Sequence, residues 1–235
     1  MKKIVIANWK MNPQTLQEAE ELFRASNGAI VCPPFIYLEE LSKIKSGAVL
    51  GAQDISLSDE PGQTGEISGE TLKQFGVKYV IIGHSERRWK LGESDETVNK
   101  KLKLALSHSL TPIICIGERS REDDFEGFLK KQVLATFAGL LSSEQAEKCL
   151  IVYEPVWAIS TTPGARPDTS QSALESIRAI KQVLNSDLPF LYGGSVTSAN
   201  VRDFLSLKEI SGILVGGASL DKEEFLRILE IALNV

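Results

Sequence analysis

Three polar side chains in the sequence have types that together could move a proton at a carbon next to a carbonyl group. Glu154 offers a carboxylate base, His84 a hydrogen-bond donor for the oxygen on which charge develops, and Lys10 a cation to stabilise that charge. This chemistry needs no bound metal and no organic cofactor. Each residue also has a simpler interpretation: a solvated lysine, a helix-capping imidazole or a surface ion-pair partner. The interpretation depends on whether the fold brings the three together.

Eight short apolar runs divide the chain and predict eight strands. The runs are continuous rather than alternating, which is typical of strands that are buried on both faces of a parallel sheet. Helical segments with N-terminal caps lie between them, for example those opened by Ser94 and Asp221. The predicted strands are 4–7, 29–32, 48–51, 79–82, 112–116, 150–153, 189–192 and 212–215.

This order of strand and helix, repeated eight times, favours a closed (β/α)8 barrel of the α/β class over the whole of residues 1–235. The length suits one domain, and no linker or low-complexity segment interrupts it. An open, doubly wound sheet is the alternative. Such a sheet normally has fewer strands and a glycine-rich turn after the first, whereas the first run here ends in Asn8-Trp9-Lys10.

In such a barrel the active site lies at the C-terminal ends of the strands, so the residues after each apolar run are informative. Asn8 and Lys10 follow the first run two positions apart, which puts both side chains on one side of an extended segment. His84 follows the fourth run and Glu154 the sixth. The barrel therefore predicts that these residues meet at one mouth.

Two glycine-rich turns follow the seventh and eighth runs, at 193–195 and 216–219. Backbone N–H groups and a helix N-terminus at this place in a barrel commonly hold a phosphate group. Either turn alone would be interpreted as a tight turn. The two together predict a phosphate site at the same mouth.

Composition excludes several other classes of protein. A net charge of −5 without a basic block argues against nucleic-acid binding. The apolar run 4–7 is too short for a signal-peptide core, and no stretch is long enough to span a bilayer, so we expect a soluble, cytoplasmic protein. Cys32, Cys115 and Cys149 are widely spaced and suggest reduced, mostly buried thiols rather than disulfides or a zinc site.

Six motifs in family order resemble those of the triosephosphate isomerase family, and the resemblance covers essentially the whole chain. They are Asn8-Trp9-Lys10-Met11-Asn12, Gly83-His84-Ser85-Glu86-Arg87-Arg88, Cys115-Ile116-Gly117-Glu118, Tyr153-Glu154-Pro155-Val156-Trp157-Ala158-Ile159, Tyr192-Gly193-Gly194-Ser195-Val196 and Gly216-Gly217-Ala218-Ser219.

The resemblance implies a TIM barrel that interconverts dihydroxyacetone phosphate and D-glyceraldehyde 3-phosphate through an enediolate, in glycolysis and gluconeogenesis. By the same resemblance, Glu154 moves the proton, and His84 polarises the carbonyl as a neutral imidazole at a helix N-terminus. Lys10 would stabilise the enediolate and the phosphate, and Asn8 would position the substrate. No metal and no cofactor is implied.

The phosphate would be held, again by resemblance, through backbone N–H groups of Ser160, Ser195, Gly216 and Gly217. Glu93 and Glu118 match positions that support the site without taking part in the chemistry. His108 has no matching motif and is interpreted as a surface residue.

Residues 64–66, after the third strand, resemble a loop tip that docks into a neighbouring subunit, which implies a homodimer. This loop departs from the family pattern, because Pro61-Gly62-Gln63 precedes Thr64 where a glycine, an alanine and an aromatic residue are usual.

The lid after the sixth strand also departs from the family. Residues 160–164 read Ser-Thr-Thr-Pro-Gly, without two glycines and a lysine that are usual there. A serine at 160 can still supply its N–H if its φ is negative. Because Pro163 is stiff and restricts Thr162, we expect Gly164 to serve as the downstream hinge.

Three alternatives remain at this stage. Another phosphate-binding barrel, such as an epimerase or an aldolase, needs a metal cluster, a second acid/base or a Schiff-base lysine, and no apolar run ends in such a residue. A non-catalytic sugar-phosphate binder is supported only by the altered lid. A nucleophilic hydrolase is disfavoured because residues 83–87 lack the closing glycine of a nucleophile elbow.

Overall fold

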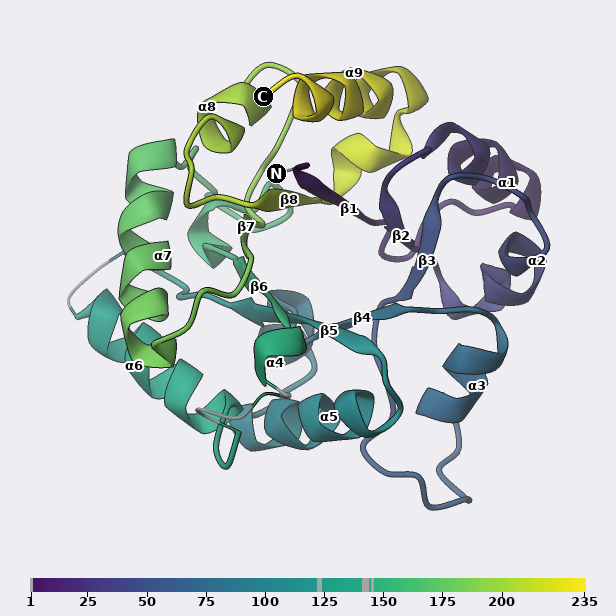
Figure 1. Cartoon of the computed structure of the whole chain (residues 1–235), viewed down its shortest axis with the longest axis horizontal. Helices are drawn as coiled ribbons and strands as arrows, with labels where there is room; N and C mark the ends of the chain where they lie inside the picture. The colour runs from purple at the N-terminus through teal and green to yellow at the C-terminus, as the bar shows by residue number, and fades with distance from the viewer. Residues whose placement is uncertain (1, 122–123, 141–143, 145) are drawn as a thin grey trace.

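Eight parallel strands close into a barrel in sequence order, surrounded by helices (Figure 1). The computed structural model describes residues 2–121, 124–140, 144 and 146–235. β1 pairs with β2 on one side and with β8 on the other, so the sheet has no free edge. The strands are β1 Ile4–Asn8, β2 Ile30–Cys32, β3 Val49–Ala52, β4 Tyr79–Ile82, β5 Thr111–Ile116, β6 Leu150–Tyr153, β7 Phe190–Tyr192 and β8 Gly212–Val215. The predicted (β/α)8 barrel is confirmed, and the open sheet is wrong.

The helices lie outside the strands and follow the predicted order. Ser94 and Asp221 cap two of them, each accepting a backbone hydrogen bond from the residue three positions on. The α-helices of the described residues are α1 Leu16–Ala25, α2 Leu38–Ser42, α3 Gly69–Gln74, α4 Ser85–Lys90, α5 Asp95–Ser107, α6 Phe125–Thr136, α7 Ser170–Leu184, α8 Val201–Leu205 and α9 Lys222–Leu233. Short 3-10 helices are η1 Phe35–Tyr37, η2 Ala146–Lys148, η3 Val156–Ala158 and η4 Gly217–Leu220.

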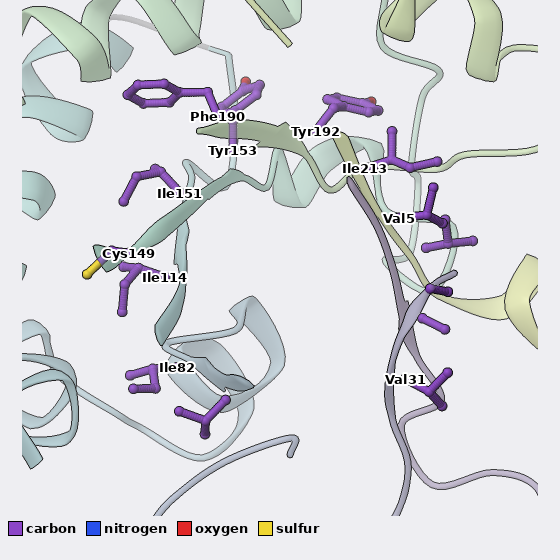
Figure 2. Close-up of a cluster of buried hydrophobic side chains, with 14 of the residues drawn as sticks. Val5, Val31, Ile82, Ile114, Cys149, Ile151, Tyr153, Phe190, Tyr192 and Ile213 are labelled. Carbon is purple, nitrogen blue, oxygen red and sulfur yellow. The ribbon is translucent and has the colours of Figure 1, made fainter. Parts of the chain in front are cut away.

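Two apolar cores explain why the strands read as continuous apolar runs. Alternate side chains of each strand point outward, against the helices, and Figure 2 shows part of this outer cluster, with Ile82, Ile114 and Ile151 from three consecutive strands. The others fill the inside of the barrel. Members of the inner cluster are Ile6, Ile30, Cys32, Ile81, Ile113, Cys115, Leu150, Val152, Leu191 and Leu214. The polar site is therefore confined to the mouth, above a filled interior.

Close strand packing leaves no space for a side chain at one strand position. A Cβ atom added at Gly212 would lie 2.1 Å from the carbonyl oxygen of Ile4 on the neighbouring β1. Glycine at this position lets β8 approach β1 and close the barrel.

Neither a membrane span nor a cluster of metal ligands was found in the described part of the chain. No helix there is long and apolar enough to cross a bilayer. Within the same residues, no three His, Cys, Asp or Glu side chains are grouped so as to hold a metal ion.

The three cysteines are free and buried, as predicted, and this makes them reporters of unfolding. Burial raises the pKa of Cys32 and Cys115 well above the usual value and that of Cys149 to about 12. Because the thiolate is the reactive form, we expect a thiol reagent at pH 8 to modify the native protein very slowly. In guanidinium chloride three thiols per chain should react at once. Rapid modification of the native protein would contradict the burial of these side chains.

Candidate active site

The structure brings all eight residues predicted to handle the substrate to one cavity of about 220 Å³ at the C-terminal ends of the strands. The cavity is lined, among others, by Asn8, Lys10, His84, Glu154, Ser160, Ser195, Gly216 and Gly217. These residues come from the last position of β1 and from the segments after β1, β4, β6, β7 and β8, which are distant in sequence. The barrel thus brings together chemical groups that no local segment could combine.

Glu154 directly follows β6 and its carboxylate is fully buried against the start of α4. The backbone N–H of Ser85 donates to its Oε2 atom at 2.8 Å, and the Ser85 hydroxyl donates to Oε1 at 3.0 Å. The Nε2 atom of His84 lies 2.8 Å from Oε1. Three polar groups therefore satisfy a carboxylate that would otherwise be costly to bury.

These donors set the charge state of Glu154. Burial by itself raises the pKa of this carboxyl group, but His84 and the two donors of Ser85 oppose that effect and hold the pKa below its usual value. Glu154 is therefore ionised at neutral pH. It carries the negative charge that a base needs, although its lone pairs are occupied by donors in this arrangement.

His84 caps the helix that it precedes, and the cap fixes its tautomer. The backbone N–H of Glu86 donates to its Nδ1 atom at 3.2 Å, which requires a free lone pair on Nδ1. The ring proton of a neutral imidazole must then sit on Nε2, the nitrogen that faces Glu154. The geometry thus agrees with the expected neutral imidazole, which is ready to donate a hydrogen bond from Nε2 into the cavity.

Lys10 adopts an unusual backbone conformation that two neighbours support. Its φ is +54°, in the left-handed region that non-glycine residues seldom adopt. Its backbone N–H donates to Asn8 Oδ1 at 3.1 Å, and its carbonyl accepts from Gln53 Nε2 at 2.7 Å. Its ammonium group lies 3.1 Å from Glu86 Oε1. These contacts hold the cation at the mouth.

Gln53, Ser85 and Glu86 were not predicted to have these roles. Residues 85 and 86 were named from the sequence only as part of the motif 83–88, and Gln53 was not named. Their signal in the sequence is position, because each lies within four residues of a strand end. Only the fold shows that the partner of Glu86 is Lys10 and that the partner of Ser85 is Glu154.

The predicted phosphate cradle lies beside Lys10. A Cβ atom added at Gly216 would lie 3.6 Å from Lys10 Cε, so the bare backbone of this turn faces the lysine side chain. Opposite it, Ser195 donates to the carbonyl of Ala158 from both its N–H, at 3.2 Å, and its hydroxyl, at 2.8 Å. One predicted phosphate donor, the N–H of Ser195, thus already binds the base of the lid.

The lid, residues 159–165, connects η3 to the segment before α7, and its two flanking segments are tied to each other. The backbone N–H of Arg166 donates to the carbonyl of Trp157 at 3.0 Å, which joins the two ends. Ser160 is exposed at the cavity and is not one of the non-glycine residues with positive φ, so its N–H is compatible with the expected role. Gly164 has a φ of +73°, which favours glycine at the predicted hinge.

Glu93 and Glu118 support elements of the site and do not line its cavity. Glu118 accepts hydrogen bonds from Tyr153 Oη at 2.8 Å and from Trp157 Nε1 at 2.9 Å, so it fastens the upstream end of the lid. Glu93 binds Arg87, which belongs to α4, at 2.8 Å. These contacts agree with the supporting roles that the resemblance implied.

His108, interpreted from the sequence as a surface residue, is not free in the structure. It caps the C-terminus of α5 and its side chain is largely buried, with Nε2 placed between both carboxylate oxygens of Asp59. The sequence contains no sign of this partner, which belongs to a loop 49 positions away in the chain.

Comparison with known proteins agrees with this geometry. A family profile described as triosephosphate isomerase matches residues 3–232. Three proteins of that name are similar along almost their full length. The one from Trichodesmium erythraeum is 42% identical and covers 97% of this chain and 99% of its own. The one from Alkaliphilus oremlandii is 38% identical and covers 97% of this chain and 98% of its own. The one from Mycoplasmoides gallisepticum is 40% identical and covers 98% of each chain. With its barrel, its cavity and this similarity, the chain belongs to the triosephosphate isomerase family.

Proposed function

We propose that Glu154, His84 and Lys10 carry out the isomerisation, with Asn8 and four backbone N–H groups holding the substrate. As a member of its family, the chain interconverts dihydroxyacetone phosphate and D-glyceraldehyde 3-phosphate, in glycolysis and gluconeogenesis. The observation that supports these residue roles best is that base, donor, cation and cradle line one cavity of about 220 Å³.

The phosphate end of the substrate fits the side of the cavity formed by the glycine-rich turns. Backbone N–H groups of Ser195, Gly216 and Gly217 would bind its oxygens, with that of Ser160 added from the lid. Because Ser195 N–H donates to Ala158 in the free protein, phosphate binding must replace that bond. The phosphate thereby competes with a contact that holds the base of the lid.

The proton transfers follow from the position of Glu154. The carboxylate removes a proton from the carbon next to the carbonyl, and the electron pair of the broken C–H bond forms the enediolate. His84 Nε2–H donates to the oxygen that gains charge, and Lys10 stabilises that charge. The hydroxyl proton on the neighbouring oxygen moves to this oxygen, with His84 Nε2 giving one proton and taking up the other, and Glu154 then returns its proton to the former carbonyl carbon. No net proton is gained or lost, and no cofactor takes part in the scheme.

Glu154 must leave Ser85 before it can reach the substrate carbon. The two hydrogen bonds from Ser85 stabilise the ionised carboxylate and therefore weaken it as a base. Once it turns into the cavity it keeps its burial and loses these donors, which raises its pKa toward that of a stronger base. Substrate binding would thus increase the basicity at the step that uses it.

Replacing the base tests this assignment. We expect Glu154→Gln to lower kcat by about 10²- to 10⁴-fold, because the amide has nearly the same shape and cannot accept the proton. The affinity for a phosphate-bearing substrate analogue should change little. Steady-state kinetics with glyceraldehyde 3-phosphate on chelator-treated protein, together with calorimetric titration, measure both quantities.

Glu96→Gln serves as the matched control, since Glu96 is an exposed carboxylate on α5. Near-normal turnover of Glu154→Gln would exclude Glu154 as the base. A loss of analogue affinity as large as the loss of kcat would assign it to binding instead.

We also propose that the lid closes over the phosphate with Gly164 as its downstream hinge. Pro163 fixes its own φ and lacks an N–H, whereas Gly164 is open to rotation and already occupies a left-handed conformation. The free surroundings of Gly164 support this, because an added Cβ atom there would meet no atom within 4 Å. Closure would exclude water from the cavity.

Gly164→Ala should slow turnover and weaken the analogue, because alanine resists the dihedral change of the hinge. The matched control is Gly76→Ala. Gly76 has nearly the same φ, +74°, and equally open surroundings, but lies between α3 and β4. Both variants should lose similar stability in thermal unfolding. If Gly164→Ala and Gly76→Ala have the same kinetics, the hinge is elsewhere.

We propose that residues 1–235 form one barrel domain and that the protein is cytoplasmic. We also propose that it is a homodimer. A second cavity, of about 420 Å³, lies beside the first and is lined by segments that follow β1 to β4, among them Lys10, His84 and Leu91. Met11 and Leu91 at its rim are exposed apolar side chains. The loop after β3 projects from the same part of the barrel (Figure 1). A two-fold axis would let each loop enter the other copy's cavity.

Light scattering should therefore give about twice the chain mass of 25.8 kDa. We expect Leu91→Arg to shift the protein to monomers and lower its activity, because a charge would be buried at the contact. Leu233→Arg is the control, since Leu233 at the end of α9 is equally exposed, at 66%. If Leu91→Arg leaves the dimer intact, this cavity is not part of the interface.

A further inference from the structure

The loop after β3 is a ten-residue projection with a closed base. The backbone N–H of Ser56 donates to the carbonyl of Ile67 at 2.9 Å, and residues 57–66 extend beyond this bond. In Figure 1 the projection lies below α3, away from the barrel. Its outer part contains Gly62 and Gly65, both with positive φ. Ordering a projecting loop of this kind costs conformational entropy, so we expect a contact with the rest of the protein that offsets this cost.

One contact ties the body of the projection to the barrel. Within the described part of the chain, the hydrogen bonds of residues 57–66 stay inside the loop and its base, except those that Asp59 accepts from His108. The His108 Nε2 atom lies 2.8 and 2.9 Å from the two oxygens of that carboxylate. The Asp59–His108 pair is thus the lateral support of the loop.

His108 is well fixed on the barrel side. Its backbone N–H donates to the carbonyl of Leu104, which ends α5, and its imidazole packs on the first residue of α3. A Cβ atom added at Gly69 would lie 2.4 Å from His108 Cδ2. The ring therefore lies between the end of α5 and the start of α3, and only 17% of the side chain is exposed.

We propose that His108 is a positioning residue for the interaction surface: by holding Asp59, it pre-orders the loop whose tip, residues 63–65, docks into a second copy of the chain. This inference rests on the proposed homodimer. A loop that is already held in one direction loses less conformational entropy when it enters the partner's cavity. The pair itself lies outside the cavity, so it acts on association without touching the substrate.

The test compares two neighbouring carboxylates of the same loop. Asp59→Ala removes the support, whereas Glu60→Ala, the matched control, removes an exposed side chain that makes no hydrogen bond or ion pair in the described part of the chain. The dimer dissociation constant is measured by sedimentation of labelled protein over a dilution series. We expect Asp59→Ala to weaken the dimer by about threefold to tenfold, and Glu60→Ala to leave it within twofold.

A double-mutant cycle shows whether the pair acts as one unit. His108→Ala should weaken the dimer about as much as Asp59→Ala, and the combined variant should be no weaker than either. Equal dissociation constants for Asp59→Ala and Glu60→Ala would overturn the inference. So would additive effects of the two single changes.

Amide hydrogen exchange separates failure of this inference from failure of the dimer. Asp59→Ala, but not Glu60→Ala, should speed exchange in residues 57–66 at a fixed oligomeric state. A wild-type chain that stays monomeric would contradict the dimer, and the docking role of the loop with it. Unchanged exchange in a dimeric Asp59→Ala variant would contradict the support by His108 alone.

Discussion

The contact between the Glu154 carboxylate and the start of α4 is the constraint on which the site depends. A charged carboxylate in the mouth of an apolar barrel loses its hydration, and only directed donors offset that loss. Ser85 and His84 supply them from one short helix. The same donors lower the basicity of Glu154, so under the proposed mechanism the free protein would hold its base in a stable but inactive position.

Because α4 carries these donors, its own anchoring matters. Arg88 donates to the carbonyl of Gly83 at 2.6 Å and to that of Cys115 at 3.2 Å, which ties the helix to the ends of β4 and β5. Arg87 bridges Asp54 and Glu93, each at 2.8 Å. Burial raises the pKa of Asp54 and thus works against its charge, so the paired cations are needed to keep this group ionised. A network of paired charges thereby sets the direction of His84.

The end of β3 connects this network to the other half of the site. Asp54 holds Arg87 on α4, and the adjacent Gln53 holds the carbonyl of Lys10. One turn thus fixes both the cation and the helix that bears the imidazole. The left-handed backbone of Lys10 costs about 1–2 kcal/mol in an isolated chain, and the contacts of Gln53 and Asn8 offset that cost.

The sequence alone predicted the barrel well because its signals are local. Continuous apolar runs reflect strands buried on both faces, and Ser94 and Asp221 mark helix starts by their side chains. Asn8, Lys10, His84 and Glu154 were proposed from their positions at strand ends, whereas Ser160 was proposed from the family resemblance alone. Lys10 and Glu86 are 76 positions apart in the chain, and His108 and Asp59 are 49 positions apart. Pairs separated in this way leave no local pattern in the sequence. Such contacts are set by how the closed barrel brings distant turns together.

The release of Glu154 from α4 is tested most directly by crystal structures of the protein alone and with a phosphate-bearing transition-state analogue. In the free protein, Glu154 Oε2 should lie about 2.8 Å from the backbone nitrogen of Ser85. With the analogue bound, we expect this bond to be broken and the carboxylate to lie within hydrogen-bond distance of the analogue. A carboxylate that stays on Ser85 in both structures, out of reach of the bound analogue, would contradict the proposed role of Glu154 as the moving base.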